Sequence, residues 1–211
     1  MRPESRYYCG MTLELLLSLM GFAFVSSITP GPNNMMLLAS GANFGLRRTL
    51  PHLFGISLGH SFMIIILGLG LIQMFDLIPW LQPAMTVAAV IYMMFLAWKI
   101  ANATPSTPDA PASVGKPFTF LQAAGFQWVN PKGWFMAITA LTAYTTSNSM
   151  WQVIAVAVTF MLTNLPSVFF WAALGVQARR FLDTPGRLRT FNWTMAVLLV
   201  LTLVPVVFGH E

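Results

Sequence analysis

The chain has 211 residues, of which 56% are hydrophobic and only 8% are charged. Soluble domains carry about 25% charged residues, and a soluble chain of this length could not bury so much apolar surface. The apolar residues fall in long blocks rather than in alternation, which favours membrane-spanning helices and disfavours a β-barrel. The composition therefore argues against a soluble protein and indicates an all-α membrane protein.

The net charge of +5 would suggest nucleic acid binding in a soluble chain. Here the basic residues flank apolar blocks, so we interpret them as topology signals and expect no nucleic-acid partner. The single cysteine, Cys9, excludes an internal disulfide and a thiolate metal site. We expect no cofactor and no bound metal, and the fourteen methionines are better explained as packing residues than as a copper relay.

Six apolar blocks predict six transmembrane helices. A single spanning helix needs about 20 residues, so the first and fourth blocks are too long for one straight helix. Both contain helix breakers near the middle, Pro30-Gly31-Pro32 in the first and Asn130-Pro131 in the fourth. The predicted spans cover residues 11–42, 52–75, 84–103, 118–144, 151–176 and 191–208.

A proline-rich stretch divides the chain into two similar halves. Each half opens with a long, broken span and continues with two plainer ones, and an odd number of spans makes the second half inverted relative to the first. We therefore expect a polar N-terminal extension (1–10), a first three-helix repeat (11–103), a linker loop (104–117) and a second three-helix repeat (118–211). Broken spans at corresponding places in inverted halves predict a binding site near the membrane midplane.

Basic residues predict the orientation of the spans. Eight of the eleven lie on one side of the six-span arrangement, and the positive-inside rule puts that side in the cytoplasm. The linker loop is then cytoplasmic and both termini are extracytoplasmic. The eight residues are Arg47, Arg48, Lys99, Lys116, Arg179, Arg180, Arg187 and Arg189.

The motif Pro30-Gly31-Pro32-Asn33-Asn34 is the sharpest local feature of the sequence. The prolines lack amide donors and the glycine is conformationally free, so the helix must open here. Opened backbone is tolerated within a bilayer only where it is buried or lines a wet cavity. The alternative is a packed structural kink, but two amide side chains beside the break favour a site for a zwitterion.

The motif Asn130-Pro131-Lys132 places a cation inside the fourth apolar block. A charge at this depth costs at least about 2.5–3.5 kcal/mol, so it predicts a function unless the side chain extends to the membrane surface. All six acidic residues fall at span ends or in loops, so Lys132 has no expected acidic partner. A substrate carboxylate would supply the missing charge, and the lack of a buried acid argues for a neutral substrate side chain.

His60 and Ser57 offer two further hypotheses within the second span. His60 could carry protons, or it could be a neutral histidine bonded to a backbone carbonyl. Gly55-Ile56-Ser57-Leu58-Gly59 matches both a helix-packing motif and the nucleophile elbow of a serine hydrolase, with His60 or His52 as base. The elbow needs a strand, a turn and a helix, so we favour packing and keep an intramembrane hydrolase as the alternative function. A metal-ion exporter is a second and weaker alternative function.

Together these motifs resemble the LysE/RhtB family of amino-acid exporters. The Pro-Gly-Pro-Asn at 30–33 is similar to that family's first-span motif, and Asn130-Pro131-Lys132 to its fourth-span motif. The resemblance extends from residue 11 over almost the whole chain, but Gln127-Trp128-Val129 and Gly133-Trp134 are bulkier than expected of the family.

The resemblance implies a secondary transporter of the inner membrane, not an enzyme. It would export small neutral amino acids or their derivatives from the cytoplasm, coupled to the proton gradient. The expected binding residues are those of the two motifs, 30–34 and 130–132, and His60 is the candidate for proton coupling. The expected partners are the substrate and the lipid bilayer, and a homodimer with a second copy of the chain is left open.

The orientation can be tested with single cysteines introduced at Arg47, Thr107 and Arg187 in a Cys9→Ser background. Because these positions belong to the basic side, an impermeant thiol reagent should label them only after the cells are opened. Labelling of Thr107→Cys in intact cells would reverse the predicted orientation.

Overall fold

The computed structural model describes residues 11–71, 77–78, 80–103, 116–145 and 149–204. Within these ranges every regular element is a helix, which confirms the all-α prediction for this part of the chain. The predicted N-terminal extension (1–10), most of the linker (104–115) and the end of the sixth predicted span (205–211) lie outside the described residues.

The first predicted span is two helices, α1 (Leu13–Ile28) and α2 (Pro32–Phe44), bent by 55° at the break. The hydroxyl of Thr12 caps the start of α1, and the helix stops before Thr29, whose extended backbone suits a residue that precedes proline. Pro32 then occupies the first position of α2, where its missing amide costs nothing. The predicted break is confirmed.

The fourth predicted span is broken as well. A capping box formed by Thr119 and Gln122 starts α6 (Phe120–Phe126), which tightens into the 3-10 turn η2 (Gln127–Val129). Asn130 is extended, and Pro131 starts α7 (Pro131–Tyr144). The interruption is longer than the sequence predicted, because a 3-10 turn precedes the Asn-Pro pair.

The remaining helices are α3 (Leu46–Ile66), which runs on into the π-helical segment η1 (Leu67–Leu71), α5 (Leu81–Ala101), α8 (Met150–Ala178) followed by the 3-10 turn η3 (Arg179–Phe181), and α9 (Pro185–Leu201). Helices α3 and α9 begin about six residues earlier than the spans predicted at 52–75 and 191–208. Gly45, with φ of 75°, turns the chain directly from α2 into α3, so Arg47 and Arg48 lie in the first turn of a helix and not in a loop.

The start of α9 explains the second early beginning. The hydroxyl of Thr184 accepts a hydrogen bond from the Arg187 amide, and Pro185 takes the first helical position. Arg187 and Arg189 therefore lie in α9, and Arg187 forms a surface ion pair with Asp183 at 2.8 Å. This Thr-Pro start was readable from the sequence, but the boundary prediction followed hydrophobicity alone.

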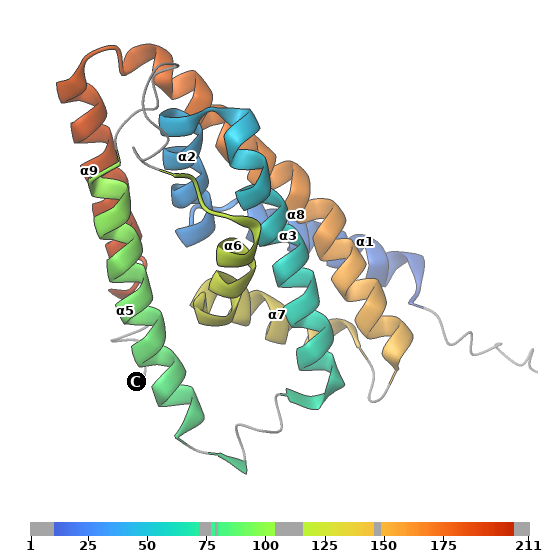
Figure 1. The fold of residues 1–211 in the computed structure, drawn as a ribbon. Helices are drawn as coiled ribbons and strands as arrows, with labels where there is room; N and C mark the ends of the chain where they lie inside the picture. Colours follow the sequence, from blue (N-terminus) through green and yellow to red (C-terminus); the bar gives the residue numbers. More distant parts are fainter. Residues whose placement is uncertain (1–10, 72–76, 79, 104–115, 146–148, 205–211) are drawn as a thin grey trace, which may run out of the picture.

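Helix α8 is the element on which α1, α2 and α3 pack, whereas α5 and α9 lie side by side (Figure 1). Small residues allow two of these contacts. A Cβ added at Gly41 would overlap the Ala172 carbonyl oxygen, and one added at Gly175 would overlap that of Leu38. Backbone-to-backbone packing of this kind is typical of membrane helices. It fixes α2 against α8.

The glycines of Gly55-Ile56-Ser57-Leu58-Gly59 make the other close contact. A Cβ at Gly55 would overlap the Phe120 carbonyl, and one at Gly59 would lie 2.5 Å from Ala124 Cα. Helix α6 therefore packs directly on α3, and the prediction that this motif serves helix packing is confirmed.

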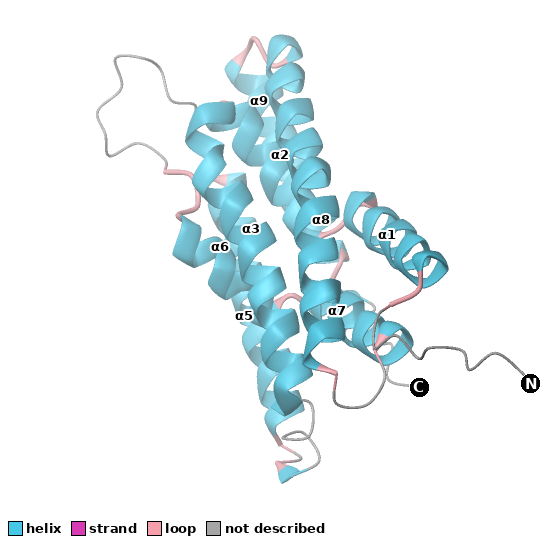
Figure 2. Ribbon diagram, turned by 90° about the vertical axis from the view of Figure 1, so that its right-hand side faces the viewer, coloured by secondary structure: helices cyan, strands magenta, loops and turns pink. Residues whose placement is uncertain are grey.

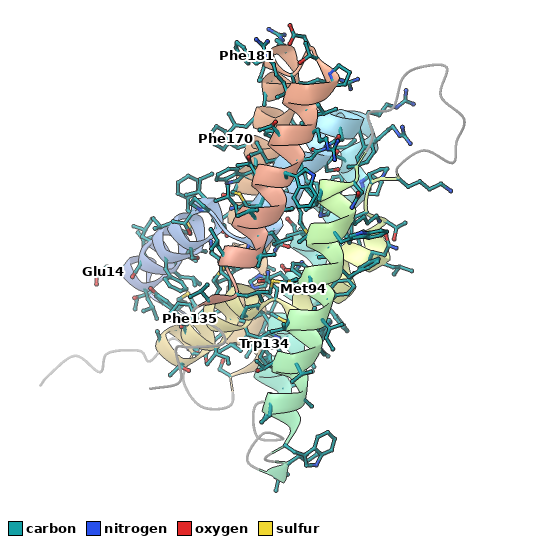
Figure 3. All side chains as sticks on the ribbon, turned by 90° about the vertical axis from the view of Figure 1, so that its left-hand side faces the viewer. Glu14, Met94, Trp134, Phe135, Phe170 and Phe181 are labelled. Carbon is teal, nitrogen blue, oxygen red and sulfur yellow. The ribbon has the colours of Figure 1, made fainter. Side chains whose placement is uncertain are left out.

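The outer surface is apolar, as lipid contact requires. Met94, Phe135 and Phe170 come from three different helices and are 50%, 66% and 49% exposed (Figure 3). Monomeric soluble proteins rarely expose apolar residues on such a scale. Helix α1 is tilted and lies to one side of the other helices (Figure 2).

Within the described residues, three helices are long and apolar enough to cross a membrane, namely Leu46–Gly70, Pro83–Ala101 and Met150–Phe181. The bent pair formed by α1 and α2 would be a fourth. The pair formed by α6 and α7 does not pass this test, nor does α9. The six-span inverted repeat therefore stays a prediction.

The close contact between α2 and α8 predicts that a single added methyl group destabilises the fold. Gly175→Ala should lower the free energy of unfolding by about 1–3 kcal/mol, because the new Cβ meets backbone that cannot move aside. Gly21→Ala in α1 is the matched control, since its Cβ would meet nothing within 4 Å and should be neutral or stabilising. Thermal unfolding in detergent, followed by gel filtration, measures both. Equal midpoints for the two variants would contradict the close contact.

Candidate functional site

The two helix breaks meet, and Lys132 joins them. Its Nζ donates hydrogen bonds to the Thr29 carbonyl at 2.7 Å, the Thr29 hydroxyl at 2.8 Å and the Pro30 carbonyl at 3.3 Å. These carbonyls follow the end of α1, where the helix provides no amide partners. The lysine of the second break therefore binds the backbone that the first break opens.

Gly31 allows this approach. A Cβ at this position would lie 2.7 Å from Lys132 Cδ and 3.1 Å from Nζ, so any larger residue would push the lysine side chain away. The glycine between the two prolines thus has a second role beyond the break itself.

Lys132 has no acidic hydrogen-bond partner among the residues that the structure describes. Of the described acids, Asp183 pairs with Arg187 at 2.8 Å, and Glu14 lies at the outer end of α1 (Figure 3). Neither of these two acids pairs with Lys132. Its ammonium is held by neutral oxygens instead.

Asn33 and Gln127 form a second link between the breaks. Asn33 Nδ2 donates to Gln127 Oε1 at 2.9 Å, and Gln127 Nε2 donates to Asn33 Oδ1 at 3.2 Å. Gln127 is fully buried and also donates to the Ala123 carbonyl. From the sequence Gln127 was noted only for its bulk, although an amide directly before a helix break was a usable signal.

Asn34 closes the first break from within. Its Nδ2 donates to the Ser27 carbonyl at 2.9 Å and to the Thr29 carbonyl at 2.8 Å, and the Trp171 indole of α8 donates to the Ile28 carbonyl at 3.0 Å. In this conformation Nδ2 of Asn33 and Nδ2 of Asn34 donate to protein oxygens, and a role of these amides in ligand binding stays a prediction. Protein groups already use them.

Asn130 and His60 keep unused polar atoms at the same place. Asn130 is 2% exposed, and its Oδ1 has no hydrogen-bond partner. His60 Nε2 lies 3.1 Å from the Gly133 carbonyl, while its Nδ1 has no partner. This contact with Gly133 is the one expected if His60 is a neutral histidine bonded to a backbone carbonyl, the second role considered from the sequence.

A small cavity of about 20 Å³ connects these groups. This volume holds about one water molecule, and we call this conformation, which has no room for a larger ligand, the closed form of the site. Its lining includes Ser26, Ser27, Gly31, Pro32, Asn33, Asn34, His60, Asn130, Lys132, Gly133, Met136 and Asn164. Pro131 is absent from this lining and acts by starting α7.

Ser57 bonds to Asn164 and not to His60. Ser57 Oγ donates to Asn164 Oδ1 at 2.8 Å, and Asn164 Nδ2 donates to Ser27 Oγ at 3.2 Å. Ser57 also lies inside α3, so the strand and turn of a nucleophile elbow are missing here. The hydrolase alternative is not favoured. Asn164 was missed in the sequence, although an amide within an apolar block, two residues before Pro166, is a recognisable signal.

The chain is similar in sequence to known transport proteins. The family described as LysE type translocator matches residues 16–209. A cysteine/O-acetylserine efflux protein of Klebsiella pneumoniae subsp. pneumoniae is 30% identical over 93% of this chain and 99% of its own length. A protein of the same name from Escherichia coli (strain K12) is 28% identical over 90% of this chain and 96% of its own length. No solved structure matches. The chain belongs to the family of LysE type translocators.

Proposed function

We propose that this chain exports small neutral amino acids through a site between its two helix breaks. The observation that carries the proposal is the contact of the Lys132 ammonium with the opened carbonyls of Thr29 and Pro30. This contact joins a cation to the backbone carbonyls of the first break, and Lys132 also lines the cavity. Membership of a family of membrane translocators, with efflux proteins as relatives, supports an exporter.

The substrate class follows from the charges at the site. Lys132 is the cation that a substrate carboxylate would contact, and none of the described cavity-lining residues is acidic. A cationic substrate side chain would therefore lack a partner, whereas a neutral one would not. Cysteine and O-acetylserine, named for the relatives, are both small neutral amino acids, and we extend that class to this chain.

The proposed architecture is that of two inverted three-helix repeats, 11–103 and 118–211. In this arrangement the linker is cytoplasmic and the termini are extracytoplasmic. Because the closed cavity is too small for substrate, the halves must move apart on one side and then on the other, as in alternating access. His60 lines the cavity together with Lys132 and its Nδ1 has no hydrogen-bond partner, and on these grounds it stays the candidate for proton coupling.

Removing the prolines of the first break should impair export. Pro30→Ala with Pro32→Ala restores two backbone amides, and these can hydrogen-bond the carbonyls that the break leaves open. Efflux from preloaded cells should fall while the membrane content of the protein stays unchanged. Normal efflux by an inserted double variant would reduce the break to a packing feature.

Lys132→Met should abolish export without preventing insertion, since it removes a costly charge and keeps much of the side-chain volume. Lys132→Arg should retain partial activity, because it keeps the charge but changes its shape and hydration. Lys116→Met, at an exposed lysine, is the matched control and should export normally.

Counterflow in liposomes can identify the group that Lys132 contacts. The acid form of a substrate should be preferred to its amide by the wild type and not by Lys132→Met. An equal preference for the acid form in both proteins would show that Lys132 does not bind the carboxylate.

A further inference from the structure

We propose that the three oxygens around Lys132 Nζ form the binding site for the substrate's own ammonium group. These oxygens are the Thr29 carbonyl, the Thr29 hydroxyl and the Pro30 carbonyl. In the closed form Lys132 fills this site itself, and it leaves the site for the carboxylate when substrate arrives. The inference rests on the proposed function and specifies how the same site recognises both ends of an amino acid.

The geometry of the three oxygens suits any primary ammonium. Such a group carries three N–H donors and no acceptor, and here the three acceptors lie 2.7, 2.8 and 3.3 Å from the nitrogen. The lysine ammonium and the α-ammonium of an amino acid present the same three donors. A site that binds one from neutral oxygens is therefore chemically able to bind the other.

Helix dipoles support the same placement. The end of α1 presents the negative pole of a helix toward Thr29, whereas the 13-residue α2 and the 14-residue α7 begin at this site with their positive poles. A zwitterion would align with these poles, its ammonium at the end of α1 and its carboxylate toward the starts of α2 and α7. Broken helices of secondary transporters bind charged substrate groups in this way.

Asn130 provides an independent observation. Its Oδ1 is buried and has no partner, and Asn130 lines the small cavity together with Lys132 and Gly31. An unpaired acceptor at 2% exposure costs free energy unless a donor reaches it. An N–H of the entering ammonium, or a water that accompanies it, is such a donor. The empty acceptor therefore indicates a ligand with hydrogen-bond donors.

Exchange between lysine and substrate conserves the hydrogen bonds. The substrate ammonium takes over the three oxygens, and the lysine ammonium gains a carboxylate that it lacks in the closed form. Gly31 lets the lysine side chain reach the three oxygens in the closed form, because a Cβ at this position would lie 2.7 Å from Lys132 Cδ. A ligand with only one of the two charged groups cannot complete the exchange, which would explain selection for zwitterions.

This assignment narrows the roles of the predicted binding residues. Asn33, Asn34 and Asn130 were all expected to belong to the site. In the structure Asn33 is paired with Gln127, and Asn34 spans the break to the Ser27 and Thr29 carbonyls. Of the three asparagines, only Asn130 keeps a buried atom without a partner among the described residues.

The test uses three ligands that differ by one charged group each, namely L-cysteine, cysteamine (no carboxylate) and 3-mercaptopropionate (no ammonium). Equilibrium binding is measured under reducing conditions on the full chain in detergent, in a Cys9→Ser background. Cysteamine should bind Lys132→Met about tenfold more tightly than the wild type, because the tethered competitor is gone. 3-Mercaptopropionate should bind Lys132→Met more weakly.

Variants of Thr29 test whether the tighter binding of cysteamine to Lys132→Met depends on the Thr29 hydroxyl. Adding Thr29→Val to Lys132→Met should remove most of the gain for cysteamine, whereas Thr29→Ser should keep it, since serine retains the hydroxyl. Gly31→Ala is a second route that leaves Lys132 in place. Its Cβ displaces the lysine side chain, so cysteamine should again bind more tightly than in the wild type.

The outcomes separate the inference from the proposed function. If cysteine binds the wild type but cysteamine binds neither Lys132→Met nor Gly31→Ala more tightly, the ammonium site is wrong and the exporter proposal stands. If the folded wild type binds no cysteine and exports no other small neutral amino acid, the proposed function itself is wrong. A gain for cysteamine that Thr29→Val does not reduce would place the ammonium elsewhere and overturn the inference.

Discussion

The hydrogen bonds from Lys132 to the end of α1 are the interaction on which the rest of the structure depends. A lysine within an apolar span costs about 2.5–3.5 kcal/mol on insertion scales, and carbonyls without partners at the same depth are also costly. Each unfavourable feature is compensated by the other. The break in the first predicted span and the lysine in the fourth are therefore a single structural feature, formed by segments about a hundred residues apart.

The neighbouring polar contacts keep that feature in place. The amide pair of Asn33 and Gln127 holds the start of α2 to the turn before α7, and Asn34 spans the break itself. Helix α8 contributes Trp171 to the Ile28 carbonyl and Asn164 to Ser27. Because the glycine contacts fix α2 against α8, these side chains reach the break with little freedom. The first break is therefore held by side chains from α2, from the turn before α7 and from α8, in addition to Lys132.

The site differs from a typical soluble binding pocket in how it obtains its charges. It uses one lysine, the poles of three helices and neutral carbonyls, and none of the described lining residues is acidic. A zwitterion can pass such a site without leaving a net charge in the membrane, whereas a cationic side chain would need an acid. The proposed preference for small neutral amino acids rests on this charge balance, because membership of a family does not by itself determine the substrate.

The sequence by itself determined the helical membrane class, the two breaks and the isolated lysine, because these depend on local chemistry. Prolines remove amides, apolar blocks of about 20 residues form spanning helices, and a lysine in such a block stands out by its cost. The packing role of Gly55 and Gly59 was likewise predictable from their spacing.

Only the tertiary structure decided which side chains hydrogen-bond to one another and to the backbone at the helix breaks. The sequence could not show that Lys132 contacts Thr29, that Gln127 pairs with Asn33, or that Asn164 takes the hydroxyl of Ser57. Such bonds join residues 94 to 107 positions apart. Their choice depends on the angle and register at which helices pack, which a hydrophobic pattern does not specify. The early starts of α3 and α9 were missed for another reason, since caps and a positive φ set those boundaries rather than hydrophobicity.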